Sequence, residues 1–180
     1  MSHFHGGKPP MAAPRVASAL KLHALSILED DCAGSLEAAC AFFAARGIVI
    51  EVLSRQRLQG FPSDLPIRTD PGELTPQQAD LYAHREIWPL DELAVFFVGS
   101  LPPMLCRGFS HPALSLCVVA LGSPPLTLAH ELGHLLGLEH VEDPENLMYL
   151  RGPRGTEAVL DQAQIRRMAA SPILSSDTRS

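Results

Sequence analysis

The sequence predicts an α/β fold in which helices cover a twisted, mostly parallel sheet. Two apolar segments with strand-like composition, 19–28 and 48–58, flank a run of strong helix formers. This run extends from Ser35, which can serve as an N-cap, to Gly47, a residue type that readily ends helices. Because short connections join the strand, helix and strand, we expect the two strands to pair in parallel.

The remainder of the chain continues the alternation of strands and helices. A helix is expected to begin at Pro76 with Thr75 as its N-cap, and a second is expected from about Leu126. Strands are expected at 92–99 and 115–122, because both segments are short, apolar and bounded by turn residues. A final amphipathic helix is predicted over 156–171.

The length of 180 residues suits one domain with its own hydrophobic core. Residues 1–17 are rich in Pro and Gly and lack periodicity, so we expect a loose tail. The single domain is therefore assigned to 18–180, and we expect it to be a monomer.

Composition and charge exclude several function classes. Fourteen basic and twenty acidic residues give a net charge of -6, which argues against a nucleic-acid partner. No apolar run is long enough for a membrane span or a signal peptide, so a cytoplasmic location is expected, with a trimmed signal or non-classical secretion as alternatives. The four cysteines have no CxxC pairing, which favours free buried thiols.

The stretch "LAHELGHLLGLEHVEDPENLMYL" holds the candidate site. On a helix, His130 and His134 lie about 40° apart around the axis and about 6 Å apart along it, so both can bind one cation. Catalytic zinc takes three protein ligands and leaves a fourth position open. A continuous helix would carry His140 too far away, but Gly137 can end the helix and let the chain turn back. We therefore predict a Zn²⁺ site made by His130, His134 and His140.

Glu131 is the candidate catalytic residue. It follows the first histidine on the helix, on the water side of the ion, where it cannot easily act as a ligand. Zinc lowers the pKa of its bound water to about 7, and a carboxylate placed beside that water can take the proton. The sequence thus predicts hydrolysis through a zinc-bound water activated by Glu131, which then protonates the leaving amine.

The stretch matches HExxHxxGxxH at every fixed position, and Met148 follows eight residues after His140. In these features the chain resembles the metzincin zinc metalloproteases, and it is most similar to a minimal, bacterial-type member of the matrixin branch without a pro-domain. The resemblance implies that the three histidines bind zinc, that Glu131 is the general base and that Met148 forms the Met-turn beneath the metal. Val141 and Leu150 depart from the usual matrixin residues and leave the subfamily open.

The same resemblance implies a backing helix, an active-site helix and an antiparallel edge strand, which would fall at Cys106–His111. It divides the domain into an N-terminal subdomain, 18–137, and a small C-terminal subdomain, 138–180, with the Met-turn and the final helix. A polypeptide substrate is expected to bind extended along the edge strand. The predicted function is therefore that of a metalloendopeptidase.

Two other functions stay open on the sequence. One is a regulatory or binding module that holds zinc without turnover. The other is a zinc hydrolase that acts on a non-protein amide. Cys106 could hold such an enzyme latent by capping the metal, but a plain buried thiol is the favoured interpretation. His84 and His111 are candidates for a second metal site, although lone histidines usually lie on the polar surface.

Overall fold

The computed structural model describes residues 18–28, 32–68, 73–103, 106–152 and 157–176. The predicted tail, 1–17, lies outside these residues. Within them, no helix is both long and apolar enough to cross a membrane.

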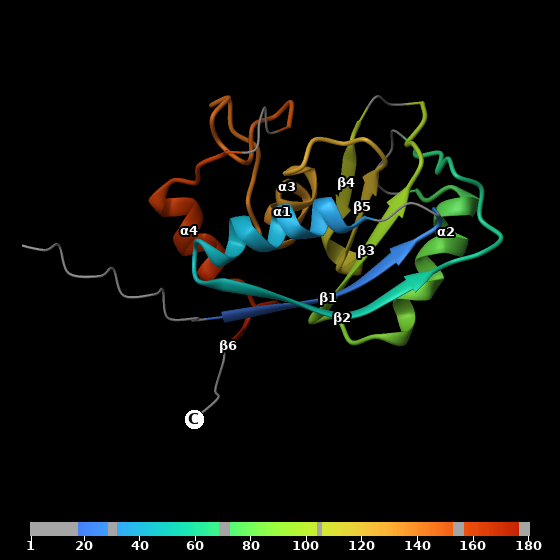
Figure 1. The fold of residues 1–180 in the computed structure, drawn as a ribbon, viewed down its shortest axis with the longest axis horizontal. Coiled ribbons are helices and arrows are strands. Elements are labelled where there is room, and N and C mark those ends of the chain that lie inside the picture. Colours follow the sequence, from blue (N-terminus) through green and yellow to red (C-terminus); the bar gives the residue numbers. More distant parts are fainter. Residues whose placement is uncertain (1–17, 29–31, 69–72, 104–105, 153–156, 177–180) are drawn as a thin grey trace, which may run out of the picture.

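The centre of the molecule is a mixed sheet with the strand order β2-β1-β3-β5-β4 (Figure 1). Neighbouring strands in this order pair in parallel until β4, which runs antiparallel to β5 at the edge. A short strand, β6, pairs antiparallel with the start of β1 and had no counterpart in the sequence prediction. The predicted mostly parallel sheet with an antiparallel edge strand is confirmed. The strands are β1 (Ser18–Ser26), β2 (Ile48–Arg57), β3 (Glu92–Val98), β4 (Gly108–His111), β5 (Leu116–Ala120) and β6 (Ser175–Ser176).

Helices cover both faces of this sheet. Buried side chains of α1 and α3 pack on one face together with Met168 of α4, whereas Leu81 and Tyr82 of α2 pack on the other (Figure 1). The sheet residues alternate between these two cores, as the pleat requires. The helices are α1 (Ala33–Ala44), α2 (Pro76–Tyr82), α3 (Thr127–Leu135) and α4 (Gln162–Ala169), with 3₁₀ turns η1 (Ala83–Ile87) and η2 (Pro112–Leu114).

The ends of two helices test the capping predictions. Thr75 caps α2 as predicted, since its side chain accepts from the Gln78 amide and Gln78 bonds back to the Thr75 amide. The N-cap predicted at Ser35 is wrong: the N-cap of α1 is Cys32, three residues earlier, and it makes no side-chain cap hydrogen bond. Packing of the first turn of α1 on the core therefore outweighs the local preference of the serine.

The final helix is shorter than predicted. It begins at Gln162, because Asp161 and Gln164 form a capping box there. The predicted start, Thr156, lies outside the described residues.

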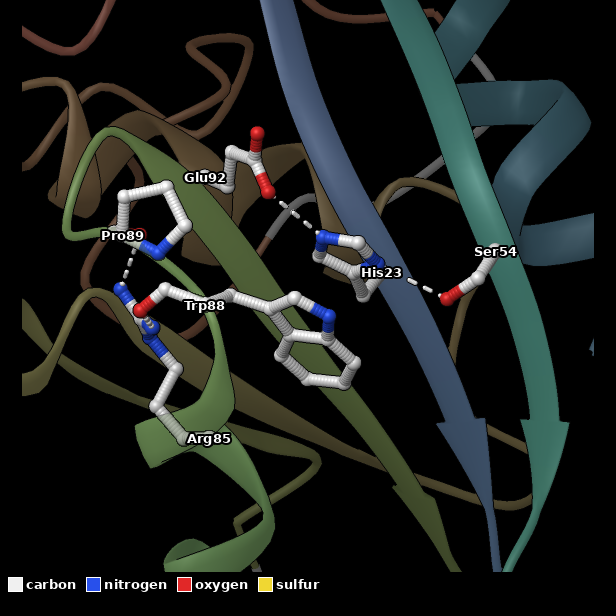
Figure 2. Close-up of polar contacts among 6 residues, drawn as sticks. All are labelled: His23, Ser54, Arg85, Trp88, Pro89 and Glu92. Carbon is white, nitrogen blue, oxygen red and sulfur yellow. Dashed lines mark hydrogen bonds and ion pairs between the residues drawn. The ribbon is translucent and has the colours of Figure 1, made fainter.

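A polar network crosses the sheet on the face opposite α1. His23 of β1 is buried, and its two ring nitrogens bond to Ser54 Oγ at 2.8 Å and to Glu92 Oε2 at 2.9 Å (Figure 2). The Trp88 ring stacks on the imidazole at a centroid distance of 3.9 Å. One side chain thereby joins three adjacent strands and the segment that leads into β3.

Arg85 is buried beside this network, and within the described part of the chain it forms no ion pair with a carboxylate. Its guanidinium instead donates to three backbone carbonyls, those of Leu114, Trp88 and Pro89, at 2.7 to 3.0 Å. Burial lowers the pKa of Arg85. These bonds fix the 3₁₀ turn η1 against the start of β5 (Figure 2 shows the pair with Pro89).

Candidate metal centre and active site

Helix α3 supplies two histidines whose Nδ1 atoms are held by backbone carbonyls. His130 Nδ1 lies 2.7 Å from the Leu147 carbonyl oxygen, and His134 Nδ1 lies 2.9 Å from that of Leu138. A carbonyl can only accept, so each Nδ1 carries the proton. The Nε2 atoms of the two neutral rings therefore present lone pairs, and they lie 3.2 Å apart.

The chain reverses at Gly137 and brings the third histidine back. Gly137 has a φ of 88°, and its amide donates to the His134 carbonyl while the Leu138 amide donates to the Gly133 carbonyl. These two bonds make a Schellman ending of α3. As a result His140 Nε2 lies 3.2 Å from His130 Nε2 and 3.1 Å from His134 Nε2. The predicted reversal at Gly137 is confirmed.

The three nitrogens fit a zinc ion. Nitrogen ligands of a tetrahedral zinc, each about 2.0–2.1 Å from the metal, lie about 3.3 Å from one another. Burial lowers the pKa of His130 to about 4 and also lowers the pKa of His134 and His140, so the rings are neutral at pH 7. Three lone pairs pointed at one spot repel one another unless a cation lies between them. Among the described residues this is the one histidine, cysteine and carboxylate cluster arranged for a metal.

Glu131 faces the same cleft from the next position of α3. Its side chain is 6% exposed, and burial raises its pKa to about 8, while a hydrogen bond from Ser110 acts in the opposite direction. A cation at the histidines would favour the ionised form. The cleft has a volume of about 470 Å³ and is bounded by α3, β4 and the segment 150–152.

Met148 is fully buried and lies against Gly133 of α3, the residue that precedes His134. A Cβ placed on Gly133 would come within 2.6 Å of Met148 Sδ, so the glycine makes room for the sulfur. The Met148 amide donates to Asn146 Oδ1 at 2.9 Å, and Asn146 is paired with Gln164 of α4. Two buried amide side chains thus hold the methionine in place beside Leu147, whose carbonyl bonds to His130.

Among the described residues, Cys106 is the one other candidate that lines the cleft, and it does not belong to the three-histidine cluster. All four cysteines are free thiols, but of these only Cys117 is fully buried. Cys106 lines the cleft half-buried, and its pKa is raised by burial and by the charge of Glu131, which disfavours a thiolate. His84 and His111 take no part in a metal cluster of the described residues.

The sequence did not identify the residues of β4 that face Glu131. Gly108 and Ser110 stand at alternate positions of this strand and both line the cleft. The strand period could have placed them on one face, but no local signal shows what lies opposite that face.

Comparison with known proteins places these features in context. A family model described as Matrixin matches residues 122–168, which contain the three histidines, Glu131 and Met148. No curated protein sequence matches the chain.

Several solved structures share the fold. Metalloproteinase-II from Bacteroides fragilis superposes with a TM-score of 0.60 at 19% identity, over 89% of this chain and 54% of that one. The chain therefore spans about half the length of that protein. Archaemetzincin from Methanopyrus kandleri gives 0.57 at 14% identity, over 91% of this chain and 98% of that one. A zinc-dependent peptidase from Methanocorpusculum labreanum gives 0.55 at 16% identity, over 82% and 99%.

At these identities the structural matches establish the fold, and the family model covers the segment that forms the site. The chain is therefore similar to the metzincin zinc metallopeptidases in its fold and to the matrixins in its three-histidine segment.

Proposed function

We propose that the protein is a zinc-dependent endopeptidase in which His130, His134 and His140 hold the metal and Glu131 is the general base. The observation that carries this proposal is the convergence of three Nε2 atoms within 3.2 Å beside a buried carboxylate, in a cleft bounded by an edge strand. A packed core does not need a carboxylate at this place. A structural zinc is closed by four protein ligands, whereas a catalytic zinc has three and keeps one position open, as the three histidines would here.

The edge strand supports a polypeptide substrate. The Arg107 carbonyl accepts from the Ala120 amide of β5, so the alternation of an antiparallel pair directs the backbone groups of Gly108 and Ser110 away from β5. An extended peptide can add to such an edge as a further strand. Its scissile carbonyl would then lie between β4 and the histidines.

The roles of the chain's own groups follow from this arrangement. Zinc at the three histidines supplies Lewis acidity, which acidifies water and polarises a carbonyl. Glu131 accepts a proton from the attacking water and delivers it to the leaving amine nitrogen, so that the peptide bond is broken and the carboxylate is regenerated. Its burial keeps bulk water from competing for this proton. Met148 supports the histidines from below without contacting the substrate.

The test compares wild type, Glu131→Gln and Glu131→Ala on a proteome-derived peptide library, with zinc content measured in all three. Both variants should keep about one zinc per chain and lose cleavage by about 10²–10⁴-fold, because general base catalysis contributes that much. Near wild-type cleavage by either variant would remove Glu131 from the mechanism.

The wild-type protein in the same experiment separates the alternatives. Stoichiometric zinc without cleavage of any peptide would identify a non-catalytic binding module. Hydrolysis of small amides but not of peptides would identify a hydrolase of non-protein substrates.

A further inference from the structure

Strand β4 lies close to α3 at Gly108. A Cβ placed on this glycine would lie 2.6 Å from Oε1, 2.8 Å from Cγ and 2.9 Å from Cδ of Glu131. These separations are shorter than any contact that non-bonded carbon and oxygen atoms tolerate. The Glu131 side chain therefore occupies the space that a side chain at position 108 would fill.

We propose that Gly108 is a positioning residue that sets where the Glu131 carboxylate lies relative to the three histidines. This role rests on the proposed function of Glu131 as the base. Gly108 has no side chain that could contact the metal or the scissile bond. It would act only because the absence of a Cβ leaves space for the Glu131 side chain.

The neighbouring residues of β4 support this role. Ser110 stands on the same face two residues later, where its hydroxyl acts to lower the pKa of the Glu131 carboxyl. Phe109 and His111 occupy the alternate positions of the strand. Strand β4 thus presents the base with one open position and one hydroxyl, and the two together confine the carboxylate from one side.

A methyl group at position 108 should displace Glu131 without unfolding the protein. The three atoms nearest to it all belong to the Glu131 side chain, which can rotate, and none of the three belongs to the backbone. No histidine atom is among them, so the metal site should stay intact. A misplacement of about 1 Å at a reacting group can reduce the rate by about 10²-fold.

The experiment measures kcat, KM, zinc affinity and melting temperature of Gly108→Ala on a peptide that the wild type cleaves. We expect kcat to fall about 10- to 100-fold. We expect KM within about 3-fold of wild type, and zinc affinity, measured by competition with a chelator, within about 2-fold. The control is Gly34→Ala in α1, where a Cβ meets nothing within 4 Å. Its kcat, KM and zinc affinity should stay near wild type, and its melting temperature should not fall, because alanine favours a helix over glycine.

Two further measurements separate positioning from a general defect of the strand. A crystal structure of Gly108→Ala should show the Glu131 carboxylate moved away from β4 and the histidines unmoved. In a Glu131→Asp background, where the carboxylate is one methylene further from β4, adding Gly108→Ala should reduce kcat by less than about 3-fold.

Different results identify which idea fails. If Glu131→Gln cleaves peptides like wild type, the proposed function fails and the role of Gly108 fails with it. Only the positioning role is refuted if Glu131→Gln is inactive but Gly108→Ala keeps the wild-type kcat. The same holds if the crystal structure of Gly108→Ala shows Glu131 unmoved. Two other results would also overturn it. One is a loss of zinc affinity as large as the loss of kcat, and the other is a loss of kcat in the Glu131→Asp background as large as in the wild-type background.

Discussion

Gly137 offers the sharpest test of how this chain builds its metal site. The residue has a φ of 88°, and a Cβ placed on it would meet nothing within 4 Å. Gly137→Ala therefore introduces no clash, and its effect is conformational. The left-handed region is less favourable for an L-residue by about 1–2 kcal/mol, part of which is offset because alanine restricts the unfolded chain.

This strain should appear as weaker zinc binding. In the metal-free protein, the segment from Gly137 to His140 can relax, because nothing holds the three lone pairs together. The zinc-bound protein must restore the left-handed turn. A difference of about 1–2 kcal/mol between the two states corresponds to a dissociation constant about 5- to 30-fold higher.

The assay is zinc competition with a chelator, together with thermal unfolding of the metal-free and the zinc-bound protein. For a chain of 180 residues, about 1–2 kcal/mol lowers the melting temperature by about 2–8 °C, and for Gly137→Ala this loss should appear in the zinc-bound protein and be smaller in the metal-free protein, where the segment relaxes. Gly60→Ala is the matched control, since Gly60 also has a positive φ, 86°, with nothing within 4 Å, and takes no part in the cleft. It should lower the melting temperature of the metal-free and the zinc-bound protein by the same amount and leave zinc affinity unchanged. Equal zinc affinities of Gly137→Ala and wild type would refute the reasoning that this turn positions His140.

Three other predictions concern the metal, the sheet and the cleft. Removing zinc with a chelator should lower the melting temperature by about 5–11 °C, relative to protein at a free zinc concentration about one hundred times the dissociation constant. His140→Ala should abolish most of that difference. A wild-type melting temperature that does not change on zinc removal would argue against a bound metal. His23→Leu leaves the Glu92 carboxylate without its imidazole partner, so the free energy of unfolding in urea should fall by about 1–3 kcal/mol, while an unaltered midpoint would show that the network adds no stability. Arg107 and Arg151 are exposed cations that line the cleft. Replacing both with Glu reverses their charge and should reduce kcat/KM for acidic peptides by about 2- to 10-fold at low salt and much less at high salt. Equal losses of kcat/KM for acidic and basic peptides would refute a charge effect.

Some features were predictable because neighbours along the chain determine them. The Thr75 capping box joins residues three apart, and the turn at Gly137 needs only a glycine at the end of a helix. The strands followed from short apolar runs, and the parallel order followed from a connection that was itself a helix. The helix start at Ser35 was wrong because packing of the first turn overrode a local preference.

The sequence by itself determined which residues could bind zinc, since the spacing of His130, His134 and His140 around a glycine is a local property of one helix and its end. Only the tertiary structure decided what surrounds them. The closeness of Gly108 to Glu131 and the support of Met148 by Gln164 join elements that are distant along the chain. Such contacts depend on how sheet and helices pack, and that packing depends on burial of the whole core rather than on any local pattern.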